Sequence, residues 1–172
     1  MTPADRQLID PSFEKRQEAF HVALLGEDDL GMVMRGQLHI EAELKRFIEA
    51  TAPSPGRVRK LSYAKRIDVA LEHGLAADLE APLRAVGRLR NRFAHRLGMV
   101  LSHDQVMKLH EAFDGFAKEV SDSSYARTCT ALAREGRPDR LDRLDPKERC
   151  AFLFVTIWIG IAAHAHHRQR AA

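Results

Sequence analysis

The sequence predicts an all-α protein, a bundle of about six helices with an apolar helix near its C-terminus. Apolar residues recur at three- and four-residue steps, as on one face of a helix, and do not alternate as they do in half-buried strands. Only 10 Gly and 7 Pro interrupt the 172 residues. The hydrophobic content of 45% supplies one core, and the chain is too short for two full domains. We therefore expect residues 1–172 to form a single helical domain.

The first two helices are predicted from their start and stop residues. Asp10 and Pro11 have the character of an N-cap and a first-turn proline, and Gly26 follows the last apolar residue of that segment. The second helix is expected to begin near Asp28 and to end at residues 51–57, a loop that is rich in proline and glycine.

The third and fourth helices are expected over residues 61–73 and 78–97. Gly74 follows the third at the position of a left-handed C-cap, and Gly98 follows the fourth. Ser102, with a glutamine three residues later, has the pattern of a capping box.

The capping box predicts a fifth helix, whose apolar residues continue to Val120. A shorter helix is expected over 123–132 and a charged linker over 133–147. The last helix is predicted over 148–165, launched by the segment Asp145-Pro146-Lys147-Glu148.

The last helix is unusual because the 13 residues 151–163 carry no charge. This stretch is shorter than the roughly 20 residues that cross a bilayer, so we expect no membrane span. Its β-branched and aromatic residues would also suit a strand, but the surrounding pattern favours a helix. A helix that is apolar on every side lies centrally in the bundle or is half covered by another copy of the chain.

The fourth predicted helix places an arginine among its apolar residues. The stripe that contains Val86 and Phe93 has Arg90 in line between them. A buried guanidinium without a partner is costly. Arg90 is therefore expected to pair with an acid inside the bundle, to extend to the edge, or to face a cleft that something else fills.

Residues 89–95, with the sequence L-R-N-R-F-A-H, resemble the R-N-x-x-x-H signature of the HEPN superfamily. These are small helical domains that include metal-independent ribonucleases and toxins of toxin–antitoxin pairs. Residues 61–75, followed by 90–95, are similar to the layout of the mannitol operon repressor family, a HEPN-related branch. The resemblance covers approximately 28–98, which we take as the HEPN-like core.

The HEPN resemblance implies that Arg90 and His95 form the motif pair, with Asn91 as their polar companion. It further implies a homodimer in which both motifs line one cleft, and it implies no metal or other cofactor. Cleavage of RNA through its 2′-hydroxyl needs a base that titrates near neutrality and a fixed positive charge, which histidine and arginine supply. Positions five apart differ by about 140° on a helix, so the helix end must be distorted or a second protomer must complete the site.

The resemblance also supports a second hypothesis, a non-catalytic regulator that acts through protein contacts. In the HEPN toxins that pair with nucleotidyltransferase-like antitoxins, a tyrosine stands two places after the histidine, and this chain has Leu97 there. The closer likeness to the mannitol operon repressor branch implies transcriptional regulation or another protein-interaction role. The partner is therefore RNA under the first hypothesis and a regulatory or antitoxin protein under the second.

The charge distribution favours an anionic partner for the motif helix. The whole chain has a formal charge of +3, yet residues 57–96 hold ten Lys and Arg against four acids, a net charge of +6. Arg84, Arg88 and Arg92 on this helix are candidate RNA-binding residues. Arg57 and Arg59 in the proline-rich loop are further candidates, although a solvated basic loop is the more frequent explanation of such residues.

The cysteines and the N-terminus favour a cytoplasmic location. Cys129 and Cys150 lie 21 positions apart without a C-x-x-C pair, so neither a zinc finger nor a disulfide framework is indicated. The N-terminal residues do not have the basic and apolar regions of a secretory signal.

Overall fold

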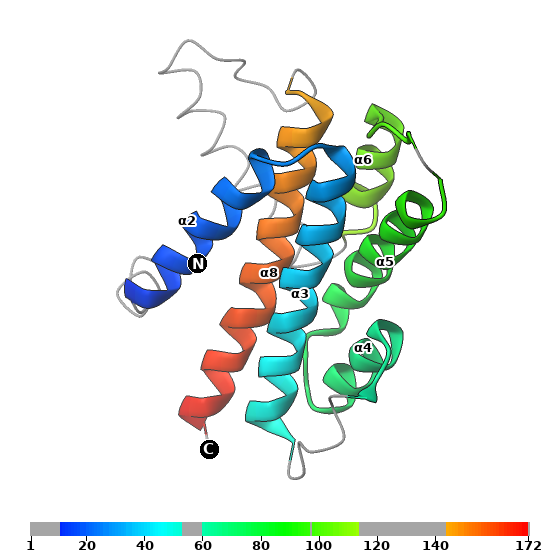
Figure 1. Ribbon diagram of the computed structural model, residues 1–172. Helices are drawn as coiled ribbons and strands as arrows, with labels where there is room; N and C mark the ends of the chain where they lie inside the picture. The colour runs from blue at the N-terminus through cyan, green and yellow to red at the C-terminus, as the bar shows by residue number, and fades with distance from the viewer. Residues whose placement is uncertain (1–10, 53–59, 97, 114–143, 172) are drawn as a thin grey trace.

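The computed structural model describes residues 11–52, 60–96, 98–113 and 144–171, and these residues form an all-α bundle without a strand (Figure 1). Within these ranges the α-helices are α2 (Pro11–Leu25), α3 (Asp29–Thr51), α4 (Tyr63–Glu72), α5 (Glu80–Ala94), α6 (His103–His110) and α8 (Pro146–Ala171). A 3-10 turn, η2 (Ala77–Leu79), precedes α5. The predicted fold class is therefore confirmed. The short helix expected over 123–132 lies outside the described residues.

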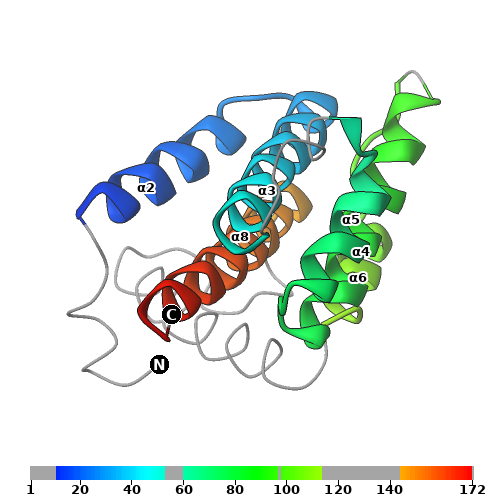
Figure 2. The same ribbon diagram turned by 90° about the horizontal axis from the view of Figure 1, so that it is seen from below.

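The two longest helices, α3 and α8, lie side by side at the centre of the bundle (Figures 1 and 2). Helix α2 packs on one side of this pair, and α4, α5 and α6 lie on the other. The core is formed mainly where the apolar faces of α3, α5 and α8 meet. Helices α4 and α5 are thereby held against α3, and this arrangement forms the site described below.

Helix α3 begins and ends close to the predicted residues. Its N-cap is Asp28, whose side chain accepts a 2.7 Å hydrogen bond from the backbone N–H of Gly31. At its middle, Gly36 is buried against the ring of Phe154 on α8, and a Cβ atom at this glycine would overlap that ring. The close contact between the two central helices therefore depends on the missing side chain.

Helix α8 occupies the central position that its uncharged sequence predicts. Its residues from Cys150 to Trp158 are buried except for the partly exposed Phe152. The helix begins at Pro146, two residues before the predicted 148, because the Asp145 carboxylate accepts a 2.7 Å hydrogen bond from the Lys147 N–H. It also extends beyond 165. The linker predicted over 133–147 therefore gives way to helix at its last two residues, and its residues 133–143 lie outside the described part.

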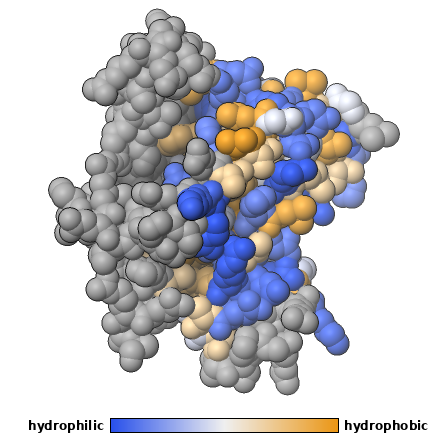
Figure 3. All heavy atoms as spheres, turned by 60° about the vertical axis from the view of Figure 1, so that its left-hand side comes forward, coloured by the Kyte–Doolittle hydropathy of each residue, from blue (hydrophilic) through white to orange (hydrophobic). Residues whose placement is uncertain are grey.

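Helix α8 also contains, over Pro146–Ala165, the single stretch in the described residues that is long and apolar enough to cross a bilayer. Most of this stretch is buried inside the bundle, which is the pattern of a core helix in a soluble protein. On the coloured part of the face in Figure 3, hydrophobic and hydrophilic side chains are interleaved.

Helices α5 and α6 are shorter than predicted. Helix α5 starts at Glu80 and ends at Ala94, three residues before the predicted end at 97. Its last turn tightens, since the Arg96 N–H bonds the Phe93 carbonyl, and the chain then passes through Gly98 at a φ of 73°. Helix α6 has the predicted capping box at Ser102 but ends at His110, so the expected continuation toward residue 120 is wrong for the residues up to 113.

Candidate functional site

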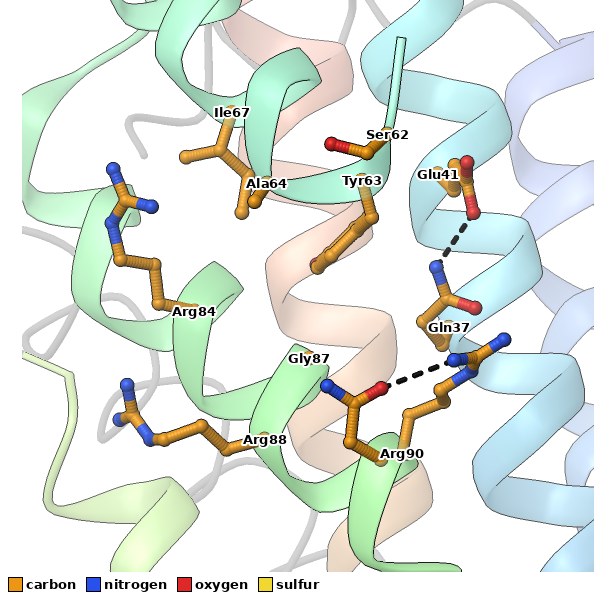
Figure 4. A pocket seen from close by; sticks show the side chains of 11 residues that line it. Gln37, Glu41, Ser62, Tyr63, Ala64, Ile67, Arg84, Gly87, Arg88 and Arg90 are labelled. Carbon is orange, nitrogen blue, oxygen red and sulfur yellow. Dashed lines mark hydrogen bonds between the residues drawn. The ribbon is translucent and has the colours of Figure 1, made fainter. Parts of the chain in front are cut away.

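A pocket of about 510 Å³ lies where α3, α4 and α5 meet (Figure 4). Its polar lining comes from all three helices and from the N-cap of α4: Gln37, Glu41, Ser62, Tyr63, Arg84, Arg88, Arg90 and Asn91. The structure therefore brings Arg84, Arg88, Arg90 and Asn91, four of the residues singled out in the sequence, to one cavity.

Arg90 is partly buried and faces this pocket. Its Nη1 donates a 3.0 Å hydrogen bond to Asn91 Oδ1, while its Nε is buried and has no hydrogen-bond partner. In the part of the chain that the structure describes, no carboxylate forms an ion pair with it. Of the three arrangements open to a core-facing arginine, the structure therefore shows the one that faces a cleft.

Arg84 lines the same pocket, but its charge is already compensated. Its Nη2 lies 2.7 Å from Asp68 Oδ1 on α4, and its Nε lies 2.9 Å from Glu80 Oε1 one turn earlier on α5. Hydrogen bonds from Arg84 and then Lys65 lower the pKa of the Asp68 carboxyl below its ordinary value. Arg84 therefore joins α4 to α5 and leaves little charge for a ligand.

The other predicted RNA-binding arginines differ in position. Arg88 lines the pocket, is exposed, and has no ion pair among the described residues. Arg92 is exposed but does not line the pocket. Arg57 and Arg59 lie outside the described residues. The available cations of the pocket are therefore Arg88 and Arg90.

The structure does not bring His95 into the pocket with Arg90. His95 is the C-cap of α5, is exposed, and is tied to the helix by the 3.2 Å hydrogen bond from its backbone N–H to the Asn91 carbonyl. A distorted end of α5 was the one alternative that would have joined the motif pair within a single chain, the other being completion of the site by a second protomer. The helix does end early, and His95 still does not line the cavity.

The pocket also contains residues that the sequence reasoning missed. Gln37 is only 3% exposed, and its Nε2 donates a 2.6 Å hydrogen bond to Glu41 Oε2. Glu41 in turn forms an ion pair with Arg66 on α4. The sequence pattern could have identified Gln37 as a candidate. It is a polar residue in the apolar stripe of α3, between Val33 and Ile40, just as Arg90 interrupts the apolar stripe of α5.

Tyr63 lines the pocket and has a structural role there rather than a reactive one. Its ring packs against Gly87, where an added Cβ would lie 3.1 Å from the ring. Its hydroxyl donates a 3.0 Å hydrogen bond to the Leu83 carbonyl, and burial raises the pKa of this phenol far above its ordinary value. Tyr63 therefore fixes α4 against α5 and stays protonated at neutral pH.

Within the described ranges, no three His, Cys, Asp or Glu side chains are grouped so that they could hold a metal ion. No family model matches the chain, and no curated protein or solved structure is similar to it. The resemblance to the HEPN superfamily and to the mannitol operon repressor family therefore rests on the motif residues alone. The all-α fold and the arginine-lined pocket are observed independently of that resemblance.

Proposed function

We propose that this protein is a HEPN-type, metal-independent endoribonuclease that binds an RNA phosphate at Arg90 and acts as a cytoplasmic homodimer. The observation that carries the proposal is the Arg90 guanidinium, which is partly buried, faces the pocket and lacks a carboxylate partner in the described chain. A partly buried cation with an unused donor is stabilised by an anion that enters the cavity.

A phosphodiester suits this arrangement because it brings charge without requiring a metal. Arg90 offers planar guanidinium donors to the phosphate oxygens, and the exposed Arg88 adds a second positive charge at the same cavity. Asn91 accepts a hydrogen bond from Arg90 and so positions the guanidinium. The excess of basic residues over 57–96 attracts a polyanion to this side of the chain.

The proposed reaction proceeds through the ribose 2′-hydroxyl. Its oxygen attacks the adjacent phosphorus while His95 accepts the hydroxyl proton, and Arg90 stabilises the charge of the phosphorane. The bond from phosphorus to the 5′ oxygen then breaks, and that oxygen takes up the proton that His95 accepted, so His95 acts first as base and then as acid. The products are a 2′,3′-cyclic phosphate end and a 5′-hydroxyl end.

The position of His95 requires a second copy of the chain in this proposal. His95 is exposed at the C-terminal end of α5 and does not line the pocket of its own chain. In a homodimer with two-fold symmetry, the two α5 ends would bring each histidine to the pocket of the other protomer.

The same position of His95 favours the second candidate, a non-catalytic regulator of the mannitol operon repressor type. Among the described residues, His95 does not line the pocket, and the Glu41 carboxylate that does is held by Arg66 and Gln37. Such a pocket can bind an anionic segment of a regulatory or antitoxin protein without cleaving RNA. This candidate predicts a stoichiometric protein partner and harmless expression. Growth arrest that disappears in His95→Ala would count against it.

The direct test incubates the purified protein with single-stranded RNA in EDTA and examines the ends of the products. Wild type is expected to leave 2′,3′-cyclic phosphates, and His95→Ala is expected to leave the RNA intact. His103→Ala is the matched control, since His103 is also an exposed histidine near a helix end. Equal cutting by wild type and His95→Ala would remove the catalytic assignment.

A further inference from the structure

Gln37 is a buried polar side chain that lines the pocket and for which the packing of the bundle gives no explanation. It is 3% exposed and lies in the apolar stripe of α3, where an aliphatic residue would fill the same space. Burial of a carboxamide is unfavourable unless its donors and acceptors are used. The orientation of the amide therefore shows what Gln37 offers to the cavity.

The orientation is fixed by Glu41. A carboxylate only accepts hydrogen bonds, so the Gln37 amino group must face Glu41, with 2.6 Å between Nε2 and Oε2. Glu41 is itself held by the ion pair with Arg66. The amide oxygen of Gln37 is then directed away from Glu41. Gln37 therefore presents an acceptor.

The pocket combines acceptors and cations (Figure 4). Gln37 and Glu41 extend from α3 on one side of the view, Arg84 and Arg88 extend from α5 on the other, and the Arg90 guanidinium is on the same side of the view as Gln37. The Gln37 amide oxygen can accept a hydrogen bond from a donor, while Arg88 and Arg90 can bind an anion. A cavity of about 510 Å³ has room for one nucleotide.

We propose that the pocket binds a nucleotide whose base carries an exocyclic amino group, and that the Gln37 amide oxygen selects this base. The inference rests on the proposed function, since it names the nucleotide that the RNA site accepts. Cytosine and adenine present an amino group, whereas uracil and hypoxanthine present a carbonyl oxygen at the same ring position. A carbonyl would face the Gln37 oxygen with two acceptors and no proton between them.

The test measures binding of CMP, UMP, AMP, IMP and inorganic phosphate to the wild-type protein by calorimetry. We expect CMP to bind about tenfold more tightly than UMP, and AMP about tenfold more tightly than IMP, as one added hydrogen bond provides. Inorganic phosphate should bind more weakly than either preferred nucleotide. Equal binding of CMP and UMP by wild type would overturn the proposal without any variant.

Gln37→Met retains the volume of the side chain and removes the acceptor, so CMP and UMP should bind it equally while phosphate binding is unchanged. Leu38→Met is the matched control, because Leu38 is 58% exposed and lies outside the pocket lining. Glu41→Gln is a second variant, since it lets the Gln37 amide turn over and should reduce the preference for CMP. If Gln37→Met and Glu41→Gln both kept the full preference for CMP over UMP, the proposed role of Gln37 would be contradicted.

The outcome also separates this inference from the proposed function. Base preference without RNA cleavage would support the pocket and remove the catalytic assignment. Cleavage of RNA without base preference would support the catalytic assignment and overturn the selection by Gln37.

Discussion

Arg90 donates a 3.0 Å hydrogen bond from Nη1 to Oδ1 of its chain neighbour Asn91, and its buried Nε has no partner. Arg84, six residues earlier on the same helix, has instead two carboxylates. The two arginines line one pocket, where Arg84 joins α4 to α5 and Arg90 is the residue that we propose binds a ligand. The contrast leads to predictions for both stability and binding.

Replacement of Arg90 is expected to leave the fold intact or to stabilise it. Arg90→Met removes a buried donor that has no hydrogen bond, and the free energy of unfolding should rise by about 1 kcal/mol or stay unchanged. The measurement is the urea midpoint of wild type and variant. A loss of several kcal/mol would show that Arg90 has a structural partner.

The ion pair between Arg84 and Asp68 predicts a pH-dependent contribution to stability. The hydrogen bond from Arg84, and then that from Lys65, lowers the Asp68 pKa below 3.8 in the folded protein. The contribution is therefore present above the unfolded pKa and is lost as the pH falls through the folded value. Asp68→Asn should be less stable than wild type at pH 7, and the difference in urea midpoint should shrink below about pH 4. Glu72→Gln, an exposed position on the same helix, should show no such trend.

The Gly36 contact predicts a large effect of one methyl group. Gly36→Ala places a Cβ in the ring of Phe154 and should lower the free energy of unfolding by about 2 kcal/mol or more. Gly26→Ala is the control, because its Cβ would lie at an ordinary contact distance of 3.6 Å from the Val22 carbonyl oxygen. The double variant Gly36→Ala with Phe154→Leu should recover part of the loss. Equal melting temperatures for both alanine variants would show that the helices are not in close contact.

The buried phenol of Tyr63 predicts a response at alkaline pH. Tyr63→Phe removes the hydrogen bond to Leu83 and should cost about 1 kcal/mol at neutral pH. Because the folded pKa is raised above 10.0, the fold favours the protonated phenol, and wild-type stability should fall as the pH rises above 10. The variant should lose less stability over this range. Parallel curves of unfolding free energy against pH would contradict the burial of this group.

Helix starts could be predicted from the sequence because their signals are local. The caps near the predicted starts, Asp28 and Ser102, both bond backbone N–H groups within three residues. The cap of α4, Ser62, was not predicted, and that helix starts two residues after the expected 61. Helix ends were less predictable. Phe113 is buried although α6 ends at His110, so apolar spacing continued beyond the helix and did not mark its end.

The site was only partly predictable, because the sequence pattern places residues around one helix but does not give the contacts between helices. The position of Arg90 in an apolar stripe could be derived from the 100° rotation per residue, and the structure confirms that it is partly buried. By the same rule Arg84 and Arg88, which are four residues apart, share one face of the helix, but the rule gives no information on Asp68, which neutralises Arg84 from another helix. Gln37 likewise reaches the pocket through the packing of α3 against α5, which depends on contacts distant in sequence.

The central claim is that Arg90 holds an RNA phosphate, and the salt dependence of RNA binding tests it most directly. A 2′-O-methylated oligonucleotide keeps the phosphates and cannot be cut. Its binding is measured from low to moderate salt for wild type, Arg90→Met and Arg35→Met, whose exposed arginine pairs with Glu27. We predict that Arg90→Met binds about tenfold more weakly and that its slope of log K against log salt is smaller by about 0.7, as loss of one single-strand phosphate contact requires. Arg35→Met should match wild type. An unchanged affinity and slope in Arg90→Met would contradict the claim.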